Sequence, residues 1–438
     1  MPLRASLKPA DFYVKAVFVL LIIMLLSDFF KEANMNIFFV LDTVKRIIWS
    51  STVFLLCFYF ARGRVHIPLS KTFVFFSMTA AILSSFQYVD RALLAFLQLF
   101  LTFSFFLQLT AFSNINFSFY HFNKLRNFFV WMIMPIALYA IIESLFGFPN
   151  LYNLAGYTID SAAIVRGDIS APTTIFSHPG NLAWILSFAA CLCFSEWVII
   201  RRRLPGFLFA ILCVALFLTM RKKSIIALLI AVIIILWITR HSFIRKLFSI
   251  AIVVVGSLLV MIVFSDFFDA IISSARLNDP FEGTLTPRLK LLLGSWDIAS
   301  SNFPLGAGLS TFGSLTSVSS YSPLYDQTGI SSQYGLSSDN PLYLLDTFWP
   351  MLVAEIGFIG AAFYFFCLLE LARKLYKYHQ KSQSNEVKFI LTVALMILIK
   401  AFIESLSTPI FSKMPYSIFI AVFCGIAISI ARRERLLR

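Results

Sequence analysis

Residues 179–199, PGNLAWILSFAACLCFSEWVI, decide the class of fold. They contain one charged side chain, Glu196, in a stretch that is otherwise almost entirely apolar. A helix of about 20 such residues is long enough to cross the hydrocarbon core of a bilayer. The segment therefore predicts a transmembrane helix, and similar stretches recur along the chain.

The overall composition agrees with this prediction. Of the 438 residues, 59% are hydrophobic and 13% are charged, against about 45–50% and about 25% in soluble globular domains. Since a single soluble core stops growing near about 250–300 residues, a soluble fold could not bury this much apolar surface. We expect an integral membrane protein.

Twelve stretches of this kind predict an all-α, polytopic membrane protein in which residues 1–438 form a single transmembrane domain. The second stretch is the weakest candidate, because Asp42, Lys45 and Arg46 crowd its start. The predicted spans lie near residues 12–30, 45–61, 68–86, 91–112, 125–148, 179–199, 204–220, 223–239, 244–265, 342–371, 387–408 and 413–431.

The basic residues predict the orientation of these spans. Cytoplasmic loops carry an excess of Lys and Arg. With a cytoplasmic N-terminus, about two-thirds of the 36 basic residues fall on the cytoplasmic side, which accounts for the net charge of +14 without a nucleic-acid partner. An even number of spans then places both termini in the cytoplasm.

Two loops on the opposite, non-cytoplasmic side are long, at residues 149–178 and 266–341. Loops of this length are functional or disordered. The second loop contains helix signals, so we expect it to form a lid with short helices. Its glycines between Gly306 and Gly313 do not have the spacing of a nucleotide-binding fingerprint, and they predict a tight turn with close backbone packing.

Several cations fall on the non-cytoplasmic side, where the topology does not favour them. Arg221, Lys222 and Lys223 lie between the seventh and eighth spans, and a bound anion would compensate for their charge. Alternatively, this hairpin is threaded the other way and the cluster is cytoplasmic. That threading would strand the arginines at 201–203 outside.

Arg166 and Arg288 lie in the two long loops. Arg166 either pairs with Asp160 or Asp168 or offers its guanidinium to a phosphate, which Arg binds in a bidentate manner. Arg288 follows Pro287, which suits the first position of a helix, and Thr286 suits its N-cap. The pattern predicts an amphipathic interfacial helix whose first turn can bind an anion, or simply a surface arginine on such a helix.

Two further candidates lie at loop ends. Asp339, followed by Asn340 and Pro341, ends the second loop before the tenth span, where a turn would hold it at the membrane surface or where it would cap the helix. His178 opens the sixth span in the same way.

Lys400 and Glu404 lie four residues apart on one face of the eleventh predicted span. Ionisable residues at membrane depth are costly and usually face an interior. The two form either a structural ion pair or a proton-coupled transport site. We find no P-loop, no Ser–His–Asp arrangement and no cluster with metal-ligand spacing, so we expect neither a cofactor nor a metal.

Four groups of motifs, taken in their order along the chain, resemble the bacterial O-antigen polymerase and O-antigen ligase superfamily over about residues 160–360. The ligases typically carry His-Asn where this chain has Asp339-Asn340, which favours a polymerase. The motifs are Arg166 with FSHPGN at 176–181, LTMRKKS at 218–224, Pro287-Arg288 with Trp296 and FPLGAG at 303–308, and SDNPLY at 338–343 with EIGFIG at 355–360.

The resemblance implies a GT-C-like membrane glycosyltransferase of the bacterial inner membrane. Such an enzyme polymerises oligosaccharide repeat units of O-antigen or exopolysaccharide, carried on undecaprenyl pyrophosphate, at the periplasmic face. It is inverting and metal-independent, its donor and acceptor are lipid-linked, and a chain-length regulator protein is a possible further partner. The alternatives are an O-antigen ligase acting on the lipid A core and a secondary transporter or lipid-glycan flippase coupled through Lys400 and Glu404.

The resemblance also suggests roles for the candidate residues. The leaving pyrophosphate gains negative charge in the transition state, so preorganised cations are the main catalytic requirement. Asp339 is the first candidate for the general base, and His178 is the second. The cations expected to bind the pyrophosphate are Arg166, Arg221, Lys222 and Arg288, of which Arg288 also acts in catalysis.

Overall fold

The computed structural model describes residues 8–33, 35–61, 63, 65–86, 89–151, 165–166, 169–239 and 287–434. The ninth predicted span, at 244–265, and residues 266–286 of the second predicted loop lie outside these ranges. The described part is helical apart from one short hairpin, β1 (Val165–Arg166) and β2 (Ile169–Ser170). The all-α membrane fold predicted from the sequence is confirmed.

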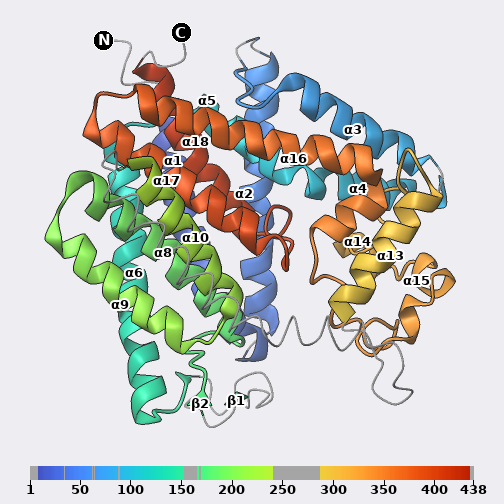
Figure 1. The fold of residues 1–438 in the computed structure, drawn as a ribbon, viewed down its shortest axis with the longest axis horizontal. Helices are drawn as coiled ribbons and strands as arrows, with labels where there is room; N and C mark the ends of the chain where they lie inside the picture. Colours follow the sequence, from blue (N-terminus) through green and yellow to red (C-terminus); the bar gives the residue numbers. More distant parts are fainter. Residues whose placement is uncertain are drawn as a thin grey trace.

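Figure 1 shows how the helices are arranged. The longer ones are α1 (Lys8–Ala33), α2 (Met35–Ala61), α3 (Lys71–Ser85), α4 (Ala92–Thr102), α5 (Ser104–Asn114), α6 (Phe119–Phe146), α8 (Pro179–Ile200), α9 (Arg203–Leu218), α10 (Lys222–Thr239), α13 (Pro287–Ser301), α16 (Trp349–Lys381), α17 (Asn385–Glu404) and α18 (Tyr416–Arg433). The short ones are η2 (Val89–Arg91), α14 (Leu315–Ser319), α15 (Leu324–Gln327) and η4 (Ile330–Ser332).

Every predicted span except the ninth coincides with a described helix or helix pair. Within the described ranges, seven helices are long and apolar enough to cross a membrane alone, namely α1, α2, α6, α8, α10, α16 and α18. The pair α4 and α5, bent by 48°, would add an eighth. The predicted third span is shortened because the helix begins only after Ser70, whose side chain accepts a hydrogen bond from the Phe73 amide. The sequence pattern counted residues 68–70 as part of it.

Helix α18 forms the centre of the bundle, with 89% of its spanning window buried. It packs against α5 and α17, and α8 packs against α9 and α17. Small residues allow this close approach. A Cβ atom at Gly425 of α18 would lie 2.5 Å from the Cβ of Phe112 on α5. The tight centre fixes the helix ends that carry the polar residues described below.

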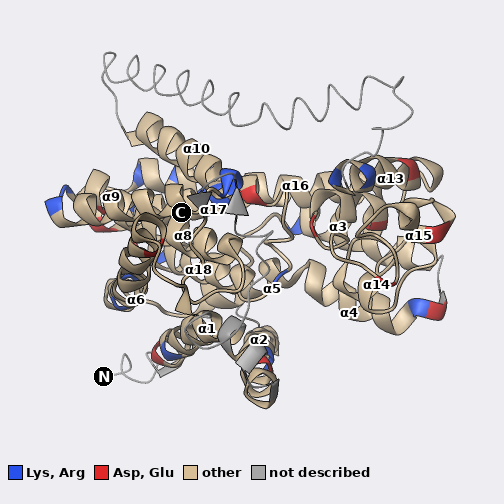
Figure 2. Ribbon diagram, turned by 90° about the horizontal axis from the view of Figure 1, so that it is seen from below, with Lys and Arg blue, Asp and Glu red and all other residues tan. Residues whose placement is uncertain are grey.

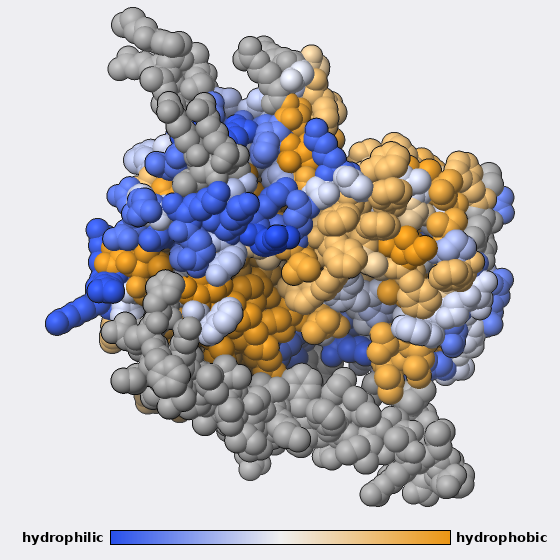
Figure 3. All heavy atoms as spheres, turned by 45° about the horizontal axis from the view of Figure 1, so that its top comes forward, coloured by the Kyte–Doolittle hydropathy of each residue, from blue (hydrophilic) through white to orange (hydrophobic). Residues whose placement is uncertain are grey.

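Charged residues connect the start of α1, the start of α6 and the end of α18 at one end of the bundle. His121 lies 3.3 Å from Asp11 and close to Arg433. Figure 3 turns this end forward and shows a hydrophilic band beside a large apolar surface. The start of α1 and the end of α18 therefore lie on the same side, as an even number of spans requires. That this side is cytoplasmic remains a prediction.

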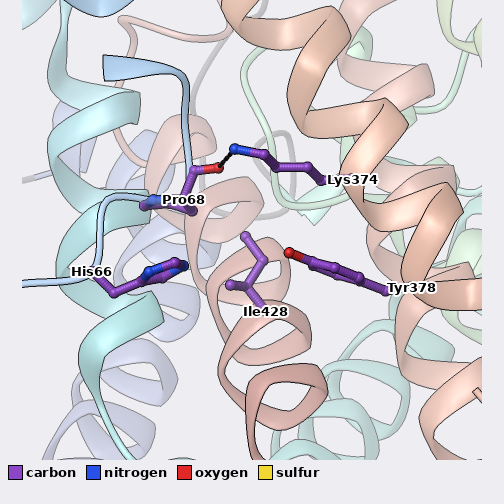
Figure 4. A pocket seen from close by; sticks show the side chains of 5 residues that line it. All are labelled: His66, Pro68, Lys374, Tyr378 and Ile428. Carbon is purple, nitrogen blue, oxygen red and sulfur yellow. Dashed lines mark hydrogen bonds between the residues drawn. The ribbon is translucent and has the colours of Figure 1, made fainter. Parts of the chain in front are cut away.

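A small cavity of about 30 Å³ lies between α16, α18 and the loop before α3 (Figure 4). It is lined by His66, Pro68, Lys374, Tyr378 and Ile428, and Lys374 Nζ donates a hydrogen bond to the Pro68 carbonyl at 2.8 Å. Burial is the main cause that lowers the pKa of His66, which favours its neutral form. A space of this size holds about one or two water molecules, so it stabilises the loop and is too small for a substrate.

The described part of the second long loop packs around its own apolar cluster, which includes Leu291, Phe312, Tyr325 and Leu344. Figure 1 shows α13, α14 and α15 together beside one end of α16. Tyr325 Oη accepts a hydrogen bond from the Gly313 amide at 2.7 Å. We call residues 287–348 the lid.

The lid is attached to a break in α16. Gly357 has φ 75° and ψ 172°, which interrupts the helix. At this break the amides of Ala307 and Gly308 donate hydrogen bonds to the carbonyls of Ala354 and Glu355, at 2.8 and 3.0 Å. The backbone approaches closely here, as the sequence predicted for this glycine-containing segment.

A buried carboxylate reinforces the attachment. Glu355 is 1% exposed, and its Oε1 accepts hydrogen bonds from the amides of Thr311 and Phe312 at 3.1 and 3.2 Å. Removing it would leave these buried amides unsatisfied, at about 1–3 kcal/mol each. The lid is therefore held rigidly on α16.

Alanine at Gly357 is expected to lower the melting temperature of the purified protein more than alanine at Gly329. Both glycines have positive φ, 75° and 65°, so both substitutions introduce backbone strain. Only at Gly357 would the new Cβ meet the backbone, 2.5 Å from the Leu305 carbonyl carbon. Thermal unfolding in detergent measures the difference, and equal shifts would contradict the packing explanation.

Candidate functional site

A polar cavity of about 270 Å³ lies at the end of the bundle opposite the His121 cluster. It is formed by the first turns of α8 and α10, the end of α17, the turn that leads into α18, and one lid residue. Its lining residues are His178, Gly180, Asn181, Trp184, Lys223, Ser224, Asp346, Glu404, Thr408, Ile410, Lys413 and Tyr416.

Two helices begin at this cavity because of their local sequences. His178 is the N-cap of α8 and Pro179 occupies its first turn, a position where the missing N–H of proline is not needed. Helix α10 begins at Lys222. Helix N-termini present unpaired N–H groups and the positive end of the helix dipole, so both favour a bound anion.

His178 and Arg221 meet at the edge of the cavity. The Nδ1 atom of His178 accepts a hydrogen bond from the Gly180 amide at 3.0 Å, and its Nε2 lies 3.2 Å from Nη2 of Arg221. A neutral imidazole has one acceptor nitrogen. The proton on His178 therefore decides whether the ring caps α8 or accepts from Arg221.

Lys223 lines the cavity, whereas the adjacent Lys222 does not. The Nζ atom of Lys223 donates a hydrogen bond to Thr408 Oγ1 at 2.5 Å, and Lys223 also interacts electrostatically with Arg288 and Lys413. Successive side chains on a helix point in different directions. The sequence does not show which lysine faces inward, so the diphosphate-binding role was predicted for Lys222, and Lys223 entered the prediction only as a member of the cation cluster at 221–223.

Arg288 borders the cavity through Asp346. Nη2 of Arg288 lies 2.8 Å from Oδ2 of Asp346, and both side chains are partly exposed. Arg288 lies in the first turn of α13, which begins at Pro287 as predicted. The predicted N-cap, Thr286, lies outside the described residues.

Asp339 lies away from the cavity-lining residues. It is exposed, and its Oδ1 accepts a hydrogen bond from Ser338 Oγ at 3.3 Å. The expected turn is present, since the Asn340 amide donates to the Ser337 carbonyl at 3.2 Å. The alternative in which Asp339 caps the helix is wrong, because α16 begins only at Trp349. Its role as the general base stays a prediction.

Arg166 belongs to β1, where it pairs with Ile169 of β2. Its predicted acidic partners, Asp160 and Asp168, lie outside the described residues. The structure therefore places His178 in the cavity lining, with Arg221 and Arg288 in contact with lining residues, and leaves the position of the Arg166 guanidinium as a prediction.

Lys400 and Glu404 form the expected ion pair at the inner end of the cavity. Lys400 Nζ lies 2.7 Å from Glu404 Oε2, and the two side chains are 2% and 1% exposed. The structural pair weighed in the sequence analysis is thus present. Glu404 also lines the cavity, which the sequence pattern did not indicate.

The cavity region is positively charged overall. Figure 2 shows basic and acidic residues together near α10 and α17. The sequence pattern did not identify Asp346 as a site residue. An acidic side chain inside the predicted span 342–371 is unusual, and this could have marked it as a candidate. With His178 neutral, the net formal charge is +3 from Lys223, Lys400, Lys413, Arg221 and Arg288 against Glu404 and Asp346.

The fold and cavity define a multi-pass helical membrane protein with a cation-rich cavity at one end of its bundle. Residues 207–365, from α9 into α16, match the family model of the O-antigen ligases. The match confirms the resemblance to the O-antigen ligase and polymerase superfamily that the sequence motifs carry. No curated protein matches the chain significantly.

Alanine at Arg288 or at Asp346 is expected to change the free energy of unfolding by less than about 1 kcal/mol, because partly exposed ion pairs contribute little. Thermal unfolding of both variants measures this, with Arg46→Ala on α2 as the control for an exposed ion pair. A loss of several kcal/mol would contradict the assignment of Arg288 to ligand binding and would give it a structural role.

Proposed function

We propose that the protein is a membrane-embedded glycosyltransferase that polymerises oligosaccharide repeat units carried on undecaprenyl pyrophosphate. The proposal places the cavity at the periplasmic face of the inner membrane, with both termini in the cytoplasm. The observation that carries it is a cavity lined by Lys223, beside which Arg221 contacts the lining residue His178 and Arg288 pairs with the lining residue Asp346. Arg221 and Lys223 lie together at the start of α10, whereas Arg288 belongs to the lid, 65 residues further along the chain.

In the proposed reaction, a hydroxyl on the acceptor glycan attacks the anomeric carbon of the donor sugar. The bond from that carbon to the diphosphate oxygen breaks, the lipid diphosphate departs, and the hydroxyl proton passes to a base. A single displacement of this kind inverts the anomeric configuration. The diphosphate gains negative charge as it leaves, so fixed cations lower the barrier and no metal is required for this.

The size and charge of the cavity suit this step. Small-molecule pockets span about 300–1,000 Å³, and a cavity of about 270 Å³ fits a diphosphate together with part of one sugar. Its net positive charge favours the charged leaving group over a neutral glycan. The remaining glycan would extend out of the bundle past the lid, and the lipid tail would stay in the bilayer.

Two residues are proposed as alternatives for the proton acceptor. His178 lies at the cavity and has a ring nitrogen within reach of Arg221. Asp339 is the other proposed base and would have to approach from the exposed surface of the lid. A positioned general base contributes about 10²–10⁴-fold to the rate, so alanine at the correct residue would reduce activity by that factor.

Alanine at Arg221 or Arg288 is expected to shorten the surface polysaccharide, because each removes a donor to the leaving diphosphate. The loss of one such donor costs about 10²–10³-fold in rate, or about 2.7–4 kcal/mol. Lysine at either position should also impair polymerisation, since it lacks the bidentate fork of arginine. Gel analysis of glycan length measures this, with Arg46→Ala as the control, and normal long chains in both alanine variants would contradict the proposal.

Deletion of the gene is expected to leave single repeat units attached to the cell surface. A polymerase joins repeats but is not needed to attach one, whereas the loss of an O-antigen ligase leaves no attached glycan. Mass spectrometry of the surface glycolipid distinguishes the two. Absence of any attached glycan would contradict polymerisation and support the ligase.

A further inference from the structure

The ion pair between Lys400 and Glu404 has no role in the proposed chemistry, and its contribution to the stability of the protein does not by itself explain why it is present. Both side chains are almost fully buried. Taking two charges out of water costs about as much as their attraction returns, so apolar residues of similar volume are often equally stable. A pair in this position calls for a function at the cavity.

Each oxygen of Glu404 has its own partner. Oε2 lies 2.7 Å from Lys400 Nζ, and Oε1 accepts a hydrogen bond from Ser224 Oγ at 2.7 Å. Lys400 is itself held over the ring of Trp184, 4.8 Å from its centroid. The carboxylate is thus fixed between α17 and the first turn of α10.

Lys223 lies next to this carboxylate and interacts with it electrostatically. Its hydrogen-bond partner is instead Thr408, in the turn that follows α17. Both residues line the cavity, and a direct ion pair between them would draw the ammonium away from a ligand. The other cations, Arg221 and Arg288, border the cavity from its outer side.

We infer that Lys400 is a positioning residue that saturates Glu404 and thereby keeps the ammonium group of Lys223 available to a diphosphate in the cavity. Ser224 occupies the second oxygen of the carboxylate and completes the arrangement. Without Lys400, the unneutralised carboxylate recruits Lys223. The inference rests on the proposed function, because it names a residue that prepares the same site for its anionic ligand.

The full-length protein in lipid nanodiscs is titrated with undecaprenyl diphosphate, and the dissociation constant is measured. Lys400→Met should weaken binding by about tenfold or more, the usual effect of losing a hydrogen bond to a charged group. Lys223→Ala should weaken binding by a similar factor. Lys388→Met, near the opposite end of α17, is the matched control and should bind like the wild type.

The double variant Lys400→Met, Glu404→Gln gives the decisive comparison. It removes both charges, and Gln can still accept from Ser224, so we expect it to fold even if Lys400→Met does not. Because no carboxylate remains to recruit Lys223, its affinity should return to within about twofold of the wild type. A merely structural role is separated in the Lys223→Ala background, where Lys400→Met should cause no further loss of affinity if it acts through Lys223, and a further loss would overturn the inference.

The outcomes separate this inference from the proposed function. If the double variant has the melting temperature of the wild type but binds about tenfold more weakly, the inference is overturned while the diphosphate site stands. The same holds if a folded Lys400→Met variant binds undecaprenyl diphosphate as tightly as the wild type. If the wild type does not bind undecaprenyl diphosphate, the proposed function and the inference both fail.

Discussion

The cost of placing charge away from water governs the structure. In hydrocarbon, charged and backbone polar groups need partners within the protein. Glu196 near the end of α8 contacts Arg126 of α6, and Lys400 pairs with Glu404 within α17. The cations at the cavity are the exception to simple pairing. They outnumber the nearby carboxylates, which is favourable if an anionic ligand supplies the missing charge.

This constraint also explains what could be predicted from the sequence. Hydrophobic stretches locate the helices because composition alone decides which segments enter lipid. Helix ends were less predictable, since they depend on local capping such as that of Ser70 before α3. Cations on the side that the predicted topology disfavours led to Arg221 and Arg288, both of which contact cavity-lining residues.

The remaining site residues depend on tertiary structure, which the sequence pattern does not contain. Lys223 rather than Lys222 faces the cavity because of the rotation of α10, and rotation is set by packing against α17. Asp346 was hidden inside a predicted span that in fact begins as a lid segment. Glu404 was expected as a partner of Lys400, and its second contact, to Ser224 on α10, joins residues 180 positions apart.

The motifs that carry the family resemblance divide into chemical and mechanical groups. The segments around His178 and Arg221 line or border the cavity, whereas those around Gly306 and Glu355 attach the lid to the break in α16. The mechanical group also has a part in the proposed reaction. Arg288 begins a helix of the lid, so its distance from the cavity is set by how firmly the lid is held. A rigid attachment keeps this guanidinium in place before the substrate arrives, which is the condition under which fixed charges lower a barrier most.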